Sequence, residues 1–195
     1  MKQPINRNEM PASHANVLAI CGSLRQASIN RTLLQAAQKL APETGLAITL
    51  FEGLGTLPIF NPDDEGREPQ NVLDFKNQLK RADGVLVASP EYAHGVTGAI
   101  KNALDWTVAS GEFMSMPVVA LNASGRATIA QAALIDTIGT MDAIILHDAC
   151  VTIALNGKNY ATDDILADET TRHPLQQALT MLAAAIAQKQ DGNAA

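Results

Sequence analysis

The sequence predicts an α/β fold built on a parallel β-sheet. Short, unbroken apolar runs alternate along the chain with longer segments whose apolar residues recur at helical spacing. Unbroken runs are typical of strands buried on both faces, and their alternation with helices is typical of parallel sheets. The 195 residues contain no internal repeat, charge block or linker that would divide them. We therefore expect a single domain.

Five strands are predicted from the apolar runs. The first is an unbroken run from Val17 to Ile20 that ends at a Cys-Gly-Ser sequence. The second is less apolar because Thr49 interrupts it, whereas the third and fourth are continuous. The fifth precedes His147, and its continuation through residues 150–155 is left open. In chain order the strands are expected at residues 17–20, 46–51, 84–88, 117–121 and 143–146.

Five helices are predicted between and after these strands. Pro42 and Gly45 close the first helix, and the second carries Val72, Phe75 and Leu79 on one face. A loop rich in Gly, Pro and Asp precedes the second helix, and the last helix is rich in Ala. In chain order the helices are expected at residues 29–40, 69–81, 97–108, 126–141 and 174–188.

The number of strands predicts the topology. Five strands fit the flavodoxin-like order 2-1-3-4-5 better than a six-stranded dinucleotide-binding sheet, and helices on both faces make a three-layer sandwich. We expect this domain to span residues 16–190, after a flexible polar N-terminus at residues 1–15. Ligands of such sheets bind outside the carboxyl ends of the strands, at the switch point between strands 1 and 3. The loops after strands 1, 3 and 4 are therefore the ones to examine.

Composition excludes several classes of protein. The chain is 47% hydrophobic and 17% charged, which is typical of a soluble globular protein. Its net charge of -6 opposes binding to nucleic acid. No apolar run has the length of a membrane span, and residues 1–15 lack the apolar core of a secretory signal. Cys21 and Cys150 form neither a zinc motif nor a redox pair. We expect a cytoplasmic protein without a metal, a membrane or a nucleic-acid partner.

The loop after the first strand has the composition of a phosphate site. Ser23, Ser28 and Asn30 supply hydrogen-bonding side chains, and Arg25 supplies a planar permanent charge. The N-terminus of the following helix adds unpaired N–H groups and a favourable dipole. No acidic residue lies between positions 9 and 43. Ser28 by itself would be only a helix cap, and Arg25 only a solvated residue, but the cluster at the switch point favours phosphate binding.

Other phosphate-binding motifs do not fit this loop. No Lys follows a second Gly, as a P-loop requires, and Gly22 stands without the further glycines of a dinucleotide fingerprint. A cysteine phosphatase would place five residues between its Cys and Arg, whereas three separate Cys21 from Arg25. We therefore expect Cys21 to be a small buried residue at the end of its strand.

The loops after the third and fourth strands suit a flat ring. Pro90 stiffens the backbone, Gly95 permits close approach, and Tyr92 offers a planar face in a chain with only 4% aromatic residues. Surface packing remains an alternative role for Tyr92, and a loop hydrogen bond an alternative role for His94. Ser124 adds a small hydroxyl group beside a glycine after the fourth strand. Together with a phosphate site, these residues predict a phosphorylated planar heterocycle as ligand.

Three segments resemble the NAD(P)H-dependent FMN reductases, a family that includes flavodoxin-like quinone, chromate and azo reductases. They are G-S-L-R-x-x-S-x-N at residues 22–30, S-P-E-Y at 89–92 and G-x-x-K-N-A-L-D-W at 98–106, and the resemblance runs from 17 to 141. Two positions depart from it, since many members have Asn where this chain has Ala93 and Pro where it has Thr97.

The resemblance implies an FMN-binding domain and a role for each matching residue. Ser23, Arg25, Ser28 and Asn30 would hold the FMN phosphate. The loop residues Pro90, Glu91 and Tyr92 would flank the isoalloxazine, with His94 and Gly95 beside them. Ser124 and its neighbours would touch the ring edge or the ribityl chain. Asp105 and Trp106 are expected to be structural. The resemblance also implies a homodimer or homotetramer with the site near an interface.

The implied activity is transfer of electrons from NADPH or NADH, through bound FMN, to a small acceptor by a ping-pong mechanism. The acceptor would be a quinone, an azo compound, a metal oxyanion or free flavin. Because the flavin carries the chemistry, no catalytic side chain is expected. The alternative is a flavodoxin-like FMN electron carrier without its own hydride-donor site. A scaffold that has lost its cofactor is a third interpretation, but it leaves the phosphate cluster unexplained.

Overall fold

Parallel pairing joins the five strands in the order β2-β1-β3-β4-β5, so the predicted topology is confirmed. The computed structural model describes residues 14–155 and 157–193. The strands are β1 (Ala15–Cys21), β2 (Leu46–Leu50), β3 (Gly84–Ala88), β4 (Pro117–Leu121) and β5 (Ile144–Ile145). The α-helices are α1 (Ile29–Leu40), α2 (Gln70–Lys80), α3 (Gly98–Asp105), α4 (Thr128–Gly139), α5 (Thr162–Ala167) and α6 (Glu169–Asn193).

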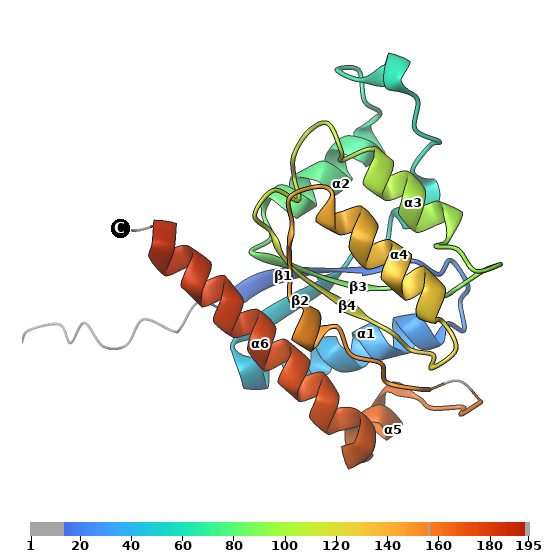
Figure 1. Ribbon diagram of the computed structural model, residues 1–195, viewed down its shortest axis with the longest axis vertical. Coiled ribbons are helices and arrows are strands. Elements are labelled where there is room, and N and C mark those ends of the chain that lie inside the picture. Colours follow the sequence, from blue (N-terminus) through green and yellow to red (C-terminus); the bar gives the residue numbers. More distant parts are fainter. Residues whose placement is uncertain (1–13, 156, 194–195) are drawn as a thin grey trace, which may run out of the picture.

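Helices cover both faces of the sheet, as a three-layer sandwich requires (Figure 1). Alternate residues of each strand point to opposite faces. Val17 and Ala19 pack with α1, α5 and α6 in one core cluster, whereas Leu18 and Ile20 pack with α2, α3 and α4 in the other. All residues of β3 and β4 are buried, which explains their unbroken apolar sequences.

The predictions for the first and the last strand need correction. β1 begins at Ala15, two residues before the predicted start, because its backbone pairs with Leu46 in β2. Of the predicted N-terminal segment, residues 1–13 lie outside the described part. β5 holds only two residues, and the segment through 150–155 forms no strand but a single bridge between Asn122 and Thr152. The chain at 147–149 turns into a 3-10 helix, which interrupts the pairing before the backbone at 151–155 bonds again to Asn122 and Ala123.

The C-terminal helix begins earlier than the prediction from Pro174. Asp168 accepts hydrogen bonds from the backbone N–H and the hydroxyl of Thr170, at 2.9 and 2.6 Å, and so supplies the N-terminal cap of α6. The prediction was wrong because it assigned Pro174 the favoured first position, whereas the proline lies inside the helix. The helix α5, which precedes Asp168, was not predicted. Its six residues are too few for a clear apolar period.

The loop between β2 and α2 projects from the body of the molecule and carries the short 3-10 helices η2 (Leu54–Thr56) and η3 (Pro62–Asp64) (Figure 1). Two α3 side chains anchor its base. The side chains of Asn102 and Trp106 both donate to the carbonyl of Pro58, at 2.9 and 2.8 Å, and Asn102 accepts from the N–H of Phe60 at 2.8 Å. This agrees with the structural role predicted for Trp106, which is almost fully buried.

No helix in the described residues combines the length and apolar character that crossing a membrane requires. Across the same residues, no three His, Cys, Asp or Glu side chains gather closely enough to hold a metal ion.

Candidate functional site

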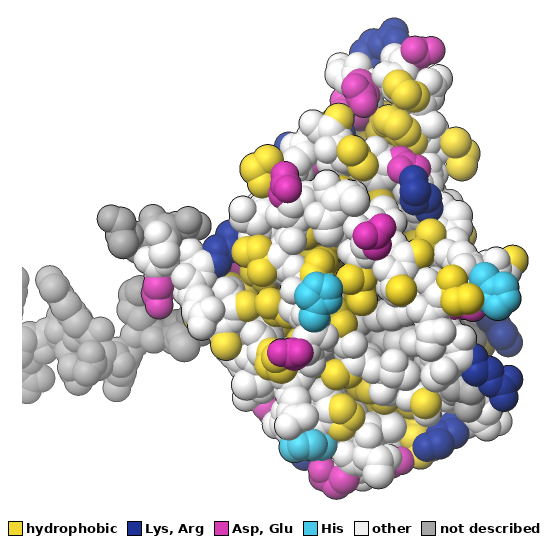
Figure 2. Space-filling view, viewed as in Figure 1, with side chains coloured by type: hydrophobic (Ala, Val, Ile, Leu, Met, Phe, Trp, Pro, Cys, Tyr) yellow, Lys and Arg dark blue, Asp and Glu magenta, His cyan; other side chains and the backbone are white. Residues whose placement is uncertain are grey.

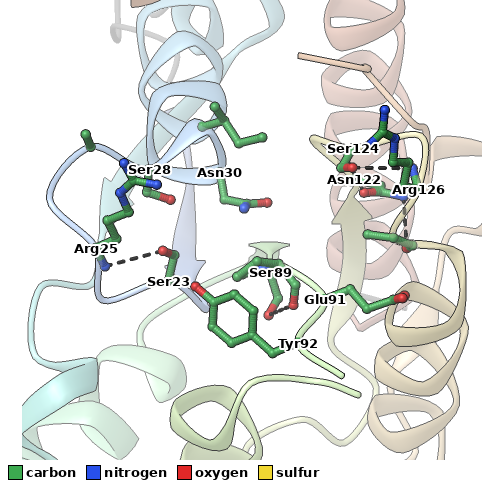
Figure 3. Close-up of a pocket in the computed structure, with 14 residues that line it drawn as sticks. Ser23, Arg25, Ser28, Asn30, Ser89, Glu91, Tyr92, Asn122, Ser124 and Arg126 are labelled. Atoms are coloured by element: carbon green, nitrogen blue, oxygen red, sulfur yellow. Dashed lines mark hydrogen bonds between the residues drawn. The ribbon is translucent and has the colours of Figure 1, made fainter. Parts of the chain in front are cut away.

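A cavity of about 360 Å³ opens at the carboxyl ends of β1, β3 and β4, where the topology predicts a ligand. Of the ten residues predicted for the site, all but His94 and Gly95 line this cavity (Figure 3). Its lining residues are Ser23, Arg25, Ala27, Ser28, Ile29, Asn30, Ser89, Pro90, Glu91, Tyr92, Asn122, Ser124, Arg126 and Ala127.

Two serines of the first loop, Ser23 and Ser28, line the cavity with hydroxyl groups. The Oγ of Ser23 accepts from the backbone N–H of Arg25 at 3.3 Å, and the Oγ of Ser28 accepts from that of Arg31 at 3.4 Å. Ser28 is therefore the N-cap of α1, as the simpler interpretation held, but it also lines the cavity. Among the described residues the Ser23 hydroxyl is used only as an acceptor, so its hydrogen can point to an anion in the cavity, whereas the Ser28 hydroxyl also hydrogen-bonds with the Cys21 side chain.

Asn30 provides the clearest sign that the first loop is built for a ligand. Its side chain is buried and lines the cavity, yet its Oδ1 has no hydrogen-bond partner among the described residues. A buried amide without a partner is costly unless a ligand supplies one. The amide can rotate to offer its NH₂ group to a phosphate oxygen. The first turn of α1 contains no acidic residue, so nothing there opposes an anion.

The first two loops of the site are in direct contact. A Cβ added to Gly22 would lie 2.2 Å from the Oγ of Ser89, so only glycine permits this approach. The N–H of Gly22 donates to the carbonyl of Ala88 at 2.8 Å, and the hydroxyl of Thr97 donates to the carbonyl of Gly22 at 2.7 Å. Thr97 also caps α3 through Ile100. These contacts fix the loop after β1 against the loop after β3.

Glu91 connects the second loop to the third. Its Oε2 accepts from the N–H of Ala130 at 2.8 Å, in the first turn of α4, and its Oε1 lies 3.2 Å from Nδ1 of His94. The hydrogen bond from Ala130, helped by His94, lowers the pKa of the Glu91 carboxyl below its usual value. Ala127, at the N-cap of α4, has no side chain that could accept a hydrogen bond from the first turn of the helix. Glu91 lines the cavity, but its carboxylate is held by α4.

Tyr92 and Gly95 close a tight two-residue turn. Each donates its N–H to the carbonyl of the other, at 3.1 and 3.0 Å. The two central residues, Ala93 and His94, have φ angles of 50° and 61°, in the left-handed region that non-glycine residues seldom adopt. His94 is exposed and is not among the residues that line the cavity, whereas Tyr92 lines it and its hydroxyl points toward Ser23 (Figure 3).

The loop after β4 forms the third wall, and a buried asparagine shapes it. The side chain of Asn122 accepts from the N–H of Ser124 at 3.0 Å and donates to the carbonyl of Ala127 at 3.1 Å. Arg126 stands on the turn that these bonds enclose. The prediction named Ser124 but omitted Asn122, Arg126 and also Ser89. The rule that directed attention to strand ends applies equally to these residues, and it could have found them.

Cys21 lies outside this cavity. It lines a neighbouring hollow of about 320 Å³ on the other side of the first loop, and its thiol lies 3.6 Å from the carbonyl of Ser23. Burial raises the pKa of the Cys21 thiol, which opposes a role as a nucleophile. The prediction that Cys21 is a buried strand-end residue is confirmed.

Comparison with known proteins decides the family. The model of the family described as NADPH-dependent FMN reductase matches residues 15–157. The chain belongs to this family. An NAD(P)H-dependent FMN reductase of Pseudomonas aeruginosa is 36% identical over 172 residues, covering 85% of this chain and 92% of that protein. This FMN reductase family member is thus an oxidoreductase with FMN and NAD(P)H as cofactors, as predicted.

Two further proteins resemble this FMN reductase family member. A solved structure of FerB, a flavoenzyme NAD(P)H:(acceptor) oxidoreductase from Paracoccus denitrificans, is 29% identical with a TM-score of 0.77. The match covers 89% of this chain and 98% of FerB. An NAD(P)H:quinone oxidoreductase of Solanum tuberosum is 43% identical over 94 residues. That match spans about half the length of either chain, 46% of this one and 48% of the other.

Proposed function

We propose that this chain takes electrons from NADPH or NADH and passes them to a small acceptor by a ping-pong mechanism. Quinones, azo compounds, metal oxyanions and free flavin are the acceptor classes. When bound, FMN supplies the redox chemistry, and the protein supplies position, hydrogen bonds and shielding from water. In a ping-pong sequence one opening serves both substrates in turn, and the cavity at the carboxyl ends of β1, β3 and β4 supports this.

The first loop would hold the phosphate of FMN. The hydroxyl groups of Ser23 and Ser28 donate to it, Arg25 adds a charge-assisted hydrogen bond, and the amide of Asn30, rotated so that its NH₂ group faces the cavity, donates as well. The dipole of α1 points its positive end to the same place. The buried, unpartnered amide of Asn30 is the observation that carries this proposal.

The second and third loops would hold the isoalloxazine. Pro90 and Tyr92 offer flat surfaces beside the first loop, and Ser124 faces them across the cavity (Figure 3). Glu91 acts as a positioning residue, because its carboxylate fixes the second loop to α4. His94 and Gly95 contribute by shaping the turn that presents Tyr92.

The absorption spectrum of the purified protein, followed by anaerobic addition of NADPH, tests this function. We expect flavin bands in the visible, and rapid bleaching of those bands without a partner protein. Bands that persist after NADPH would favour the alternative, an electron carrier. The double variant Arg25→Ala, Ser28→Ala should lose most of its FMN, whereas Arg81→Ala, which removes the same charge far from the cavity, should retain it. Full FMN retention in the double variant would refute the phosphate assignment.

We also propose that the protein forms a homodimer or homotetramer in the cytoplasm. Ile129, Ile144 and Met181 are exposed on α4, β5 and α6, and Figure 2 shows hydrophobic side chains at the surface of the face on which α4 and α6 lie. Both cysteines are free, which agrees with a reducing compartment. Light scattering on the purified protein tests the oligomer, and a monomer at micromolar concentration would refute it.

A further inference from the structure

Arg126 is a charged residue of the cavity whose guanidinium charge is not assigned to the FMN phosphate. Charged side chains line the cavity at three positions, Arg25, Glu91 and Arg126. The carboxylate of Glu91 is engaged by the N–H of Ala130 and by His94. Arg25 belongs to the loop that would hold the phosphate. Within the described residues, Arg126 makes no ion pair, and its guanidinium is left to meet another anion.

The position of Arg126 is fixed by its loop rather than by its own side chain. Its backbone N–H donates to the Oγ of Ser124 at 3.3 Å, and the N–H of Ala127 donates to the carbonyl of Ser124 at 3.1 Å. Asn122, only 2% exposed, holds this turn by two hydrogen bonds, one accepted by its side-chain oxygen and one donated by its side-chain nitrogen. The backbone from which the Arg126 side chain extends to the cavity is therefore held in place by hydrogen bonds.

Arg126 also stands apart from the phosphate loop. Figure 3 shows it on the wall formed by Ser124 and Asn122, across the cavity from Arg25 and Ser28. One phosphate monoester on the first loop would therefore leave Arg126 for a second anionic group. The chain as a whole is acidic, with a net charge of -6. The guanidinium of Arg126 would therefore favour substrates that carry an anionic group over neutral ones.

We infer that Arg126 is a specificity-determining residue that binds an anionic group of the hydride donor or of the acceptor. This inference rests on the proposed function, since it takes FMN to occupy the first loop. Two sources offer the required chemistry: the 2′-phosphate that distinguishes NADPH from NADH, and a carboxylate or sulfonate on the acceptor. A planar guanidinium forms paired hydrogen bonds with either group.

The experiment compares wild type, Arg126→Ala and Arg81→Ala, each loaded with FMN. The first arm measures kcat/KM for NADPH and for NADH with a neutral naphthoquinone as acceptor. The second arm measures kcat/KM for that quinone and for its sulfonate, with NADH as donor. In Arg126→Ala we expect kcat/KM for the anionic partner to fall about tenfold, as loss of one exposed charge-assisted hydrogen bond predicts. The value for its neutral counterpart should change less than about twofold, as should all values for Arg81→Ala.

Direct binding supplies a second readout. If Arg126→Ala lowers kcat/KM for NADPH in the first arm, calorimetry should show that this variant binds NADP⁺ more weakly than wild type and binds NAD⁺ equally well. The difference in NADP⁺ affinity should become smaller at high salt. Equal losses for charged and neutral partners, or ratios that Arg126→Ala leaves unchanged in both arms, would overturn the inference while FMN binding persisted. Wild-type protein that takes up no FMN would instead overturn the proposed function and the inference with it.

Discussion

The hydroxyl of Thr97 donates a 2.7 Å hydrogen bond to the backbone carbonyl of Gly22, a residue 75 positions earlier. Thr97 is the N-cap of α3, and Gly22 begins the loop after β1, so this buried bond joins two of the three loops of the site. The resemblance given above implies Pro at this position, and proline has no side-chain donor. In this chain the threonine adds a contact that fixes the first loop.

Thr97→Val should therefore destabilise the protein. The substitution keeps the shape of the side chain but leaves the Gly22 carbonyl without its donor and α3 without its cap. We expect the free energy of unfolding in urea to fall by roughly 1–3 kcal/mol. Thr180→Val, at an exposed position of α6, is the control and should change it by no more than about 0.5 kcal/mol. Equal effects of the two substitutions would contradict the role of Thr97.

Ala93→Gly should stabilise the turn that presents Tyr92. Ala93 has a φ of 50°, which glycine adopts without strain. We expect the free energy of unfolding to rise by about 0.5–1 kcal/mol. This is the relief of strain in the left-handed backbone, reduced by the greater flexibility that glycine gives the unfolded chain. Ala132→Gly, on the exposed side of α4, should instead lower stability by about 1 kcal/mol. Thermal unfolding measures both, and a loss of stability in Ala93→Gly would show that the turn is not strained.

Glu91→Gln should remove part of the pH dependence of the free energy of unfolding. The Ala130 N–H lowers the pKa of the Glu91 carboxyl from its ordinary 4.5, so the ionised form stabilises the fold. That contribution is present above the ordinary pKa and is lost as the pH falls through the lowered pKa of the folded state. Urea unfolding at several pH values should show wild type more stable than Glu91→Gln near neutrality, with the difference vanishing at low pH. A difference that stayed constant down to low pH would rule out this linkage.

Asn102→Ala should loosen the projecting loop without unfolding the domain. Asn102 accepts from the N–H of Phe60 and donates to the carbonyl of Pro58, so its loss frees the base of the loop. Hydrogen exchange of the Phe60 amide should quicken by about tenfold or more, as loss of a buried hydrogen bond predicts. Asn77→Ala, at an exposed position of α2, should leave the exchange unchanged. Unaltered exchange in Asn102→Ala would mean that other contacts hold the loop.

Cys21→Ser should retain activity. Burial raises the pKa of the thiol, so at neutral pH it is neither a thiolate nor a nucleophile. We expect kcat/KM for NADPH within about threefold of wild type and slow reaction of Cys21 with thiol reagents in the native protein. Complete loss of activity in a folded Cys21→Ser variant would revive a catalytic role for this cysteine.

The sequence predicted the sheet well because its strands are buried on both faces. β3 and β4 appear in the sequence as unbroken apolar runs, and both were placed with their observed bounds. β5 has only two residues, and its length is decided by where pairing with Pro117 and Val118 stops, which composition does not encode. The start of α6 depended on Asp168, whose capping bonds appear only in three dimensions.

The site was predictable to the extent that it follows from topology. Loops at strand ends converge, so Ser23, Asn30 and Tyr92 could be grouped before their positions were known. The role of Glu91 could not be foreseen, because its partner, the Ala130 N–H, lies 39 residues away and has no side-chain signature. The same holds for Thr97 and for Asn122, which bind backbone carbonyls of other segments or of their own turn.

Comparing the affinities of FMN and riboflavin for flavin-free protein tests the central claim most directly, because the two ligands differ only by the phosphate monoester. If the loop from Ser23 to Asn30 binds that phosphate, FMN should bind at least about a hundredfold more tightly than riboflavin, as two or more charge-assisted hydrogen bonds predict. The Arg25→Ala, Ser28→Ala variant should lose most of this preference. Equal affinities of wild type for FMN and riboflavin would contradict the account.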